Sequence, residues 1–307
     1  MSVLRWTTGR FEERGLATPR LDAEILLAQA LGLPRLQLYV QFDRPLTPDE
    51  LTAIRGLVKR RQGGESVAYI IGRKEFFGLE FAVDARVLVP RPDTETLVDE
   101  AVARLRPPAP SPEREVASGA EPPAEDTLAE KQAPPTRPAI TGKVAEIGTG
   151  SGAIIVTLGK RLPDLSLFAV DVSSDALDVA RANAVRHGVS VTFLQGDLDG
   201  PLRPFAPFEL IVANLPYIPT GDLAALAPEV QAEPRLALDG GPDGLELVRR
   251  LCAAAPSLLA PGGALALELG AGQAPAVAAF CREAGLVDVQ MRRDLGAIDR
   301  VVSAKKP

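Results

Sequence analysis

The sequence predicts an α/β protein in which a mostly parallel sheet follows a small helical unit and a β-hairpin. The first observation is a helical spacing of apolar residues over residues 1 to about 66. The second is a regular alternation of strand-like and helix-like segments from Val144 onward. The third is a glycine-rich turn, residues 146–152, directly after the first of these strands. With 307 residues, 46% of them hydrophobic, the chain is long enough for two domains with buried cores.

Residues 1–66 are expected to form an amino-terminal helical domain. Apolar residues from Leu21 begin one helix, which should end near Gly32 because glycine readily adopts the left-handed conformation of a helix end. Thr47 and Glu50 have the spacing of a capping box, and Pro48 suits the first turn of the helix that follows. The segment therefore predicts a small helical bundle.

Residues 67–106 are expected to connect this bundle to the sheet. From Val67 to Val89 the residues are rich in β-branched and aromatic types, and glycines interrupt them at positions 72 and 78. This pattern is typical of strands that pair as a hairpin. Asp93 or Thr94 is expected to cap the helix that follows.

Residues 107–138 contain mainly Pro, Ala, Glu and Ser and almost no aliphatic residues. This composition predicts a disordered linker, because such a segment buries too little apolar surface to offset the entropy of ordering. Residues 139–307 then form the sheet-containing domain. Its expected strands are Val144–Ile147, Leu167–Asp171, Val191–Leu194, Leu210–Ala213 and Ala264–Leu269, followed by a terminal hairpin of Val287–Met291 and Arg300–Ser303 whose last strand is antiparallel.

Charge and composition exclude several classes of function. The net charge is −6 with no extended basic cluster, which weighs against duplex DNA as a partner. Lys59–Arg61 is a local exception that fits a solvated helix face or a contact with ribosomal RNA or an acidic partner. No apolar run is long enough for a membrane span or signal peptide, so we expect a cytoplasmic protein without membrane contact. Two cysteines and one histidine, His187 at a helix end, are too few for a metal site, so we expect none.

The glycine-rich turn predicts a site for a nucleoside-bearing cofactor. Its glycines allow a tight turn and close approach of a ligand, and the next helix points its amino terminus at the same place. The turn also fits a dinucleotide-binding enzyme, with Asp171 as the ribose-binding acid. Three features favour S-adenosyl-L-methionine instead: Glu146 two residues before the first glycine, the Gly196–Asp197 pair after the third strand, and the segment Asn214–Tyr217 after the fourth.

Each predicted cofactor residue has a physical role. Asp171 is expected to accept from both ribose hydroxyls, and Asp197 from the adenine amino group, although each could instead stabilise a local turn. Leu198 would provide an apolar wall, and Glu146 would orient the turn or the methionine ammonium group. The predicted cofactor site comprises Glu146, Gly148, Thr149, Gly150, Ser151, Gly152, Asp171, Asp197, Leu198 and Asn214.

The segment Asn214-Leu215-Pro216-Tyr217 predicts the methyl-acceptor site. An amide nitrogen is a poor nucleophile, so its lone pair must be aimed at the methyl group from roughly 3 to 3.5 Å. The Asn214 side-chain oxygen and the Leu215 carbonyl can each accept one N–H, while Pro216 keeps Leu215 extended. The Tyr217 ring can lie flat on the acceptor. The alternative is a strand-ending turn with an aromatic residue packed in the core.

Motifs are spread along nearly the whole chain, at residues 68–72, 76–81, 89–95, 148–152, 214–219, 233–235, 239–241 and 299–300. They resemble those of the protein-(glutamine-N5) methyltransferases of the HemK/PrmC family. The resemblance implies a helical domain that docks class I peptide chain release factors, a hairpin, and a seven-stranded class I (Rossmann-like) methyltransferase domain. It also implies that residues 214–217 hold the glutamine of a Gly-Gly-Gln loop.

The chain departs from this family in two places. Leu215 stands where the family commonly has proline, which should loosen the turn and leave the backbone carbonyl available. Residues 107–138 resemble an insertion. The loop 90–95 is expected either to cover the cofactor as a wall or lid, or to be a rigid connector.

Three alternative functions share part of the pattern. A glutamine methyltransferase acting on a ribosomal protein would share the acceptor motif. An adenine-N6 DNA methyltransferase could stack a flipped base on Tyr217, but the acidic charge argues against it. A non-catalytic cofactor-binding module would not require Asn214 and Tyr217.

Overall fold

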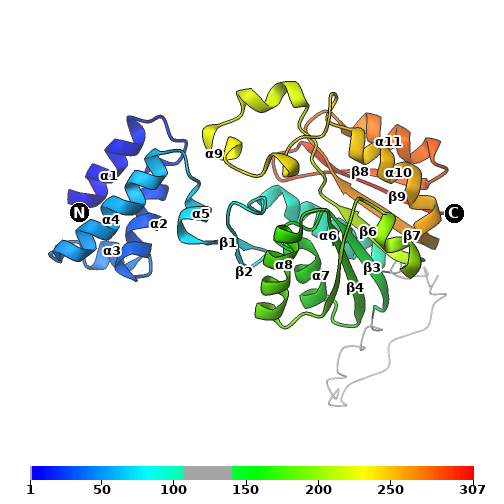
Figure 1. The fold of residues 1–307 in the computed structure, drawn as a ribbon, viewed down its shortest axis with the longest axis horizontal. Coiled ribbons are helices and arrows are strands. Elements are labelled where there is room, and N and C mark those ends of the chain that lie inside the picture. The colour runs from blue at the N-terminus through cyan, green and yellow to red at the C-terminus, as the bar shows by residue number, and fades with distance from the viewer. Residues whose placement is uncertain (1, 107–139) are drawn as a thin grey trace, which may run out of the picture.

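The computed structural model describes residues 2–106 and 140–307, and the linker predicted at 107–138 lies outside these ranges. A helical lobe lies beside a larger α/β lobe, and the hairpin lies between them (Figure 1). In the described part of the chain, no helix has both the length and the apolar character needed to cross a membrane.

The helical lobe confirms the helices predicted around residues 21 and 48. Gly32 ends the second helix in the left-handed conformation, and Thr47 and Glu50 form the capping box. Leu26 and Ile54 are buried where the helices meet. The helices of the lobe are α1 (Ser2–Glu12), α2 (Pro19–Leu31), α3 (Gln37–Val40), α4 (Pro48–Gln62) and α5 (Val67–Ile71).

The hairpin begins later than the sequence predicted. Residues 67–71, expected as the start of a strand, form α5 instead. The Ser66 side chain caps this helix by accepting from the Tyr69 N–H, and Ile70 packs into the core of the helical lobe. The cap and this packing outweigh the β-propensity of the five residues. The antiparallel hairpin, β1 (Arg73–Phe76) with β2 (Leu79–Ala82), follows Gly72.

The helix predicted after the hairpin is present as α6 (Glu95–Leu105), but its predicted cap is wrong. A short 3₁₀ helix, η1 (Pro92–Thr94), precedes it, and neither helix has a side-chain cap. Thr94 instead accepts a hydrogen bond from Asn214, and Asp93 pairs with Arg300. Both side chains are directed to tertiary partners, which local spacing does not reveal.

The larger lobe contains a seven-stranded sheet in the order β5-β4-β3-β6-β7-β9-β8. The first five strands in this order are parallel, and β9 is antiparallel to both of its neighbours, as the sequence predicted. The strands are β3 (Gly142–Ile147), β4 (Leu165–Asp171), β5 (Val191–Gln195), β6 (Phe208–Ala213), β7 (Leu259–Glu268), β8 (Val287–Arg293) and β9 (Asp299–Lys305).

Helices cover both faces of the sheet, which buries two apolar cores. One core joins strand residues to α6 and α7, and the other joins them to α10 and α11. The two cysteines are buried in the second core, and His187 ends α8 as predicted, with its ring nitrogen bonded to the Glu80 carbonyl. The remaining elements are α7 (Ala153–Arg161), α8 (Ser174–His187), η2 (Gly200–Phe205), η3 (Thr220–Ala225), α9 (Pro228–Gln231), η4 (Arg235–Ala237), α10 (Glu246–Leu258) and α11 (Ala274–Glu283).

Arg61 connects the two lobes. Its guanidinium is buried and bonds Asp22 in α2 at 2.7 Å and Glu229 in α9 at 2.5 Å. The prediction of a solvated face at Lys59–Arg61 is therefore wrong for Arg61, because two carboxylates from distant segments enclose it. Its neighbour Arg60 pairs with Glu65 within the helical lobe.

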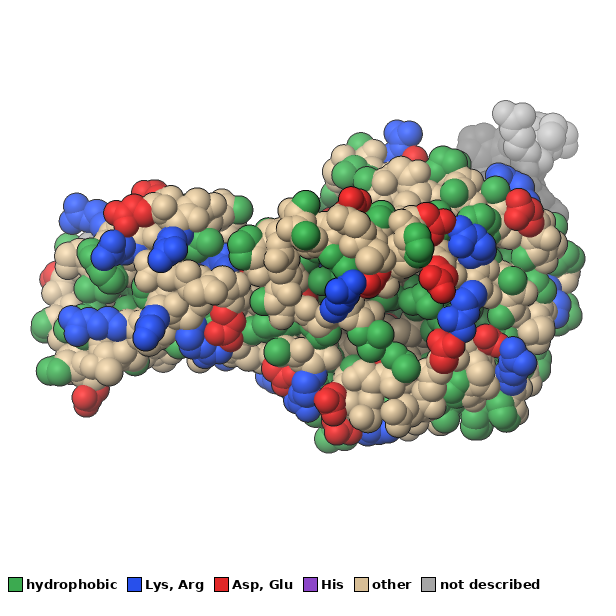
Figure 2. Space-filling model, turned by 45° about the horizontal axis from the view of Figure 1, so that its top comes forward, with side chains coloured by type: hydrophobic (Ala, Val, Ile, Leu, Met, Phe, Trp, Pro, Cys, Tyr) green, Lys and Arg blue, Asp and Glu red, His purple; other side chains and the backbone are tan. Residues whose placement is uncertain are grey.

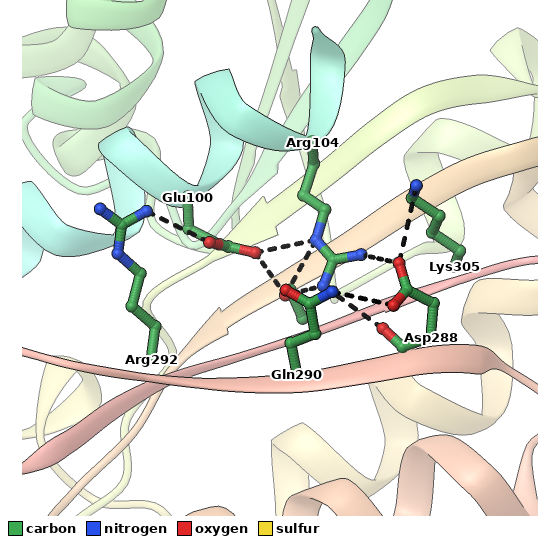
Figure 3. A network of polar contacts seen from close by, with 7 residues as sticks. Glu100, Arg104, Asp288, Gln290, Arg292 and Lys305 are labelled. Carbon is green, nitrogen blue, oxygen red and sulfur yellow. Dashed lines mark hydrogen bonds and ion pairs between the residues drawn. The ribbon is translucent and has the colours of Figure 1, made fainter. Parts of the chain in front are cut away.

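A polar network joins α6 to the two carboxyl-terminal strands (Figure 3). Arg104 is its centre: its side chain is 5% exposed and donates to Glu100 at 2.8 Å, to Ser303 and to Asp288 at 2.6 Å. Arg292 pairs with the second oxygen of Glu100. The network ties the strands that complete the sheet to α6, which also packs in the first of the two cores.

Replacing Arg104 with alanine is expected to lower the free energy of unfolding by about 3–5 kcal/mol, because the buried Glu100 carboxylate loses its principal cation. Urea denaturation followed by circular dichroism measures this change. Arg181→Ala, which removes an exposed ion pair with Asp178, is the matched control and should cost about 0–1 kcal/mol. Equal losses in the two variants would show that the buried network stabilises the protein no more than an exposed ion pair does.

Candidate active site

A cavity of about 270 Å³ opens at the carboxyl ends of β3, β4 and β6. It brings together most of the residues that the sequence predicted for the cofactor and acceptor sites. Gly152 and Tyr217 are not among the residues that line it. The predicted residues that do line it are Glu146, Gly148, Thr149, Gly150, Ser151, Asp171, Asp197, Leu198, Asn214, Leu215 and Pro216.

The glycine-rich turn is held by backbone hydrogen bonds to the neighbouring strand. The N–H groups of Gly148 and Thr149 both donate to the carbonyl of Val170, at 2.9 and 3.0 Å. Gly148 has a φ of +76°, and a Cβ there would lie 3.2 Å from the Leu215 side chain. A side chain at this position would therefore be strained and would also press on the acceptor segment.

Glu146 lies buried beneath the turn. Its carboxylate accepts from the Thr149 hydroxyl at 2.6 Å and from the Ile155 N–H at 3.1 Å, so it joins the turn to the first turn of α7. Burial raises the pKa of Glu146 to about 8. These contacts support a role in orienting the turn.

The raised pKa of Glu146 predicts that stability of the cofactor-free protein falls with rising pH. A carboxyl group with a pKa of about 8 when folded and an ordinary value near 4.5 when unfolded holds its proton more tightly in the folded state. The folded state is therefore favoured at low pH, and this contribution is lost as pH rises from about 4.5 to about 8.

Urea midpoints at pH 5.5 and pH 8.5, compared between the parent and Glu146→Gln, measure this effect. The parent should lose more stability across the interval than the variant, which has no proton to release at this position. An identical loss in both proteins would assign the pH dependence to other groups.

Asp171 and Asp197 lie at the cavity but already have protein partners. Asp171 accepts from the Gly150 N–H at 2.9 Å through one oxygen and from the Ser173 N–H at 3.0 Å through the other. The turn role that the sequence left open is therefore present, and each oxygen keeps a second lone pair for a ribose hydroxyl. Asp197 is 63% exposed and pairs with Arg250, and its neighbour Leu198 is buried with a φ of +45°.

Asn214 follows β6 directly and reaches the cavity beside the glycine turn. Its amide nitrogen donates to the Thr94 hydroxyl at 3.3 Å, which leaves its side-chain oxygen as the group able to accept from a substrate. The Leu215 side chain is buried against Gly148, so leucine at this position adds a contact between the acceptor segment and the cofactor turn. The arrangement fits two acceptors facing a planar N–H donor.

The ring of Tyr217 lies outside the cavity, next to Gly270. Its backbone carbonyl accepts from the Gln273 side chain at 2.9 Å, and burial raises the pKa of its hydroxyl. The charges of Glu268 and Arg300 act on the same hydroxyl. Stacking of Tyr217 on an acceptor amide stays a prediction.

Part of one cavity wall had no assigned role in the sequence analysis. The residues on this side of the cavity are Arg86, Val87, Leu88, Pro90, Arg91 and Thr94, and the last three belong to the loop 90–95 that was expected to be a wall, a lid or a rigid connector. Arg91 pairs with buried Glu233 at 2.6 Å, which fixes this wall to the segment after α9. Only the motif at 233–235 hinted at Glu233, and no sequence signal pointed to Glu268, which ends β7 beside Asn214.

Comparison with known proteins identifies both parts of the chain. Residues 2–72 match the model of the PrmC N-terminal domain, a range that includes α5, and residues 144–233 match a methyltransferase domain. A solved structure, ribosomal protein L11 methylase from Lactobacillus delbrueckii subsp. bulgaricus, is 18% identical with a TM-score of 0.43, covering 76% of this chain and 86% of that one.

Curated relatives match over almost their whole length. The release factor glutamine methyltransferase of Geobacter sulfurreducens is 45% identical to this chain, and the match spans 99% of this chain and 95% of the relative's length. The protein of the same name from Chlorobaculum tepidum is 41% identical, with coverages of 99% and 96%. The chain therefore belongs to the release factor glutamine methyltransferase family.

Proposed function

We propose that the protein transfers a methyl group from S-adenosyl-L-methionine to the side-chain amide nitrogen, N5, of the glutamine in the Gly-Gly-Gln loop of class I peptide chain release factors. The observation that carries the proposal is the position of Asn214 beside the glycine turn, with its nitrogen bonded to Thr94 and its oxygen left to accept. Membership of the release factor glutamine methyltransferase family supports the same substrate class.

The chemistry follows from the acceptor segment. The oxygens of Asn214 and of the Leu215 backbone each accept one N–H of a primary amide, so that the nitrogen lone pair points at the methyl group. The sulfonium of the bound cofactor supplies a methyl group that is already activated for transfer. A carboxylate in this place would leave two acceptors facing another acceptor, so the site selects glutamine over glutamate.

The residues predicted from the sequence for the cofactor are proposed to bind S-adenosyl-L-methionine in the roles first expected of them. Glu146 and residues 148–152 form the turn that receives the methionine end of the cofactor. Asp171 accepts from the ribose hydroxyls with the lone pairs left free by its backbone contacts, and Asp197 accepts from the adenine amino group after moving away from Arg250. Leu198 supplies the apolar wall.

The helical lobe is proposed to dock the release factor. It stands beside the α/β lobe (Figure 2), and large apolar side chains reach its surface, among them Leu36 at 73% and Val40 at 63% exposed. Exposed apolar side chains of this size are common at protein–protein contacts. Such a position lets a protein substrate rest on one lobe while a loop enters the cavity of the other.

Incubation with S-adenosyl-L-methionine and a class I release factor, followed by mass spectrometry of the Gly-Gly-Gln peptide, tests the proposal. A single added methyl group on glutamine is the expected result. A ribosomal protein and duplex DNA are parallel substrates, and methyl transfer to either of these in place of the release factor would overturn it. Absence of transfer to all three, with the cofactor bound, would indicate a non-catalytic binding module.

A further inference from the structure

Glu268 is a buried carboxylate that the proposed chemistry does not use. It ends β7, next to the end of β6, where Leu267 is paired with Ala213. The residue is 1% exposed, it does not line the cavity, and its Oε2 atom has no hydrogen-bond partner among the described residues. A buried oxygen without a donor is unusual in a folded protein and calls for a functional explanation.

The side chains of Thr94 and Asn214 lie close enough to the Glu268 carboxylate to lower its pKa by hydrogen bonding, although Oε2 itself has no bonded partner among the described residues. Both favour the ionised carboxylate, as expected for donors directed at it. Asn214 also donates to the Thr94 hydroxyl at 3.3 Å. The three side chains therefore form a chain of polar groups that leads from the buried end of β7 to the acceptor site.

The chemistry of these groups determines which group donates and which accepts in each hydrogen bond between them. A hydroxyl both donates and accepts, so Thr94 alone would tolerate either orientation of the Asn214 carboxamide. An ionised carboxylate only accepts, so Thr94 must donate to Glu268 and can then only accept from the Asn214 nitrogen. The Asn214 oxygen is thereby left for the substrate.

We propose that Glu268 is a positioning residue that fixes the orientation of the Asn214 carboxamide, so that its oxygen and not its nitrogen meets the substrate amide. This inference rests on the proposed function of Asn214 as an acceptor. Glu268 acts through its two neighbours and does not touch the substrate.

If Glu268 positions Asn214, turnover should depend on the ionisation of Glu268 and therefore on pH. Burial raises the pKa of Glu268 to about 7, against the donors Thr94 and Asn214 and the charge of Arg300, while Asp93 raises it further. Arg300 itself bonds Asp294, and Tyr217 is the other titratable group that faces Glu268. Once protonated, Glu268 can donate to Thr94. The direction of the hydrogen bonds can then reverse, and the Asn214 carboxamide can turn its nitrogen toward the substrate. Turnover should therefore rise as pH rises through about 7.

The test measures kcat and KM of the full-length enzyme on a release factor between pH 6 and pH 8.5. The glutamine side chain in Glu268→Gln both donates and accepts, so this variant should have a kcat roughly tenfold lower at pH 8 and no rise of kcat near pH 7. The KM values for S-adenosyl-L-methionine and for the release factor should both stay within twofold of the parent. In an Asn214→Ala background, the same substitution should have no further effect on kcat. A Glu268→Gln kcat within twofold of the parent, or a full tenfold loss in the Asn214→Ala background, would overturn the inference.

Two further variants keep the test decisive if Glu268→Gln does not fold. Thr94→Val removes the hydroxyl and should lower kcat by about as much, and Thr94→Ser should recover most of that loss. Equal activity of Thr94→Val and Thr94→Ser would contradict the inference. Glu100→Gln alters another buried glutamate, away from the cavity, and should leave kcat of the folded enzyme within twofold.

The two proposals fail in different ways. Full turnover in Asn214→Ala would remove the acceptor role and with it the proposed mechanism. Loss of turnover in Asn214→Ala together with parental behaviour of Glu268→Gln would overturn only the positioning role of Glu268.

Discussion

Replacing Asn214 with alanine is expected to lower kcat for release factor methylation on the order of 100-fold. The substitution removes one of the two oxygens that hold the acceptor amide, and that contact is strongest in the reaction geometry. Initial rates of methyl transfer at saturating cofactor and release factor measure the loss.

Binding of the cofactor is the control for this variant. The described contacts of the glycine turn involve Glu146, Val170 and Asp171 and do not include the Asn214 side chain. Calorimetric titration with S-adenosylhomocysteine should therefore give a Kd within a few-fold of the parent value. Turnover within twofold of the parent would contradict the acceptor role, and a lost cofactor affinity would assign Asn214 to cofactor binding instead.

Gly244→Ala is expected to produce the second large effect, although Gly244 does not line the cavity. Its φ is +74°, and a Cβ at this position would lie 2.3 Å from the Tyr217 carbonyl oxygen and 2.9 Å from the Gln273 side chain. The backbone of the acceptor segment must therefore move. A displacement of about 1 Å in a segment that positions substrate can cost about 100-fold in rate, so we expect a fall in kcat of that order.

Gly221→Ala is the matched control. Gly221 lies in η3, a few residues beyond the acceptor segment, and a Cβ there would meet nothing within 4 Å. Its kcat should stay within twofold of the parent, and both variants should show native circular dichroism. If Gly244→Ala turned over as fast as Gly221→Ala, the loop around Gly244 would not be what holds the acceptor segment in place.

The sheet and its ligand-binding edge were accessible from the sequence because they follow from local rules. Apolar runs of strand length alternate with helical segments, and this alternation specifies a parallel sheet. The carboxyl ends of its strands meet at one edge, so the sequence alone predicts that residues 146–152 and Asn214 lie together.

Local rules failed where a distant contact competes with them. The β-rich composition of residues 67–71 predicted a strand, but Ser66 caps a helix there and Ile70 completes the core of the helical lobe. Thr94 had the chemistry of a helix cap, yet its hydroxyl accepts a hydrogen bond from Asn214, 120 residues away. Arg61 looked like part of a solvated face, yet Asp22 and Glu229 enclose it.

The sequence by itself determined the fold class, the cofactor turn and the acceptor segment, because each depends on the spacing of residues that are neighbours along the chain. The tertiary structure alone decided what surrounds the acceptor. Glu268 and Thr94 come from separate segments, and only folding brings them to Asn214 and excludes water from Glu268. A carboxylate acquires an unusual pKa and a fixed hydrogen-bond direction from that burial, which no spacing of residues encodes.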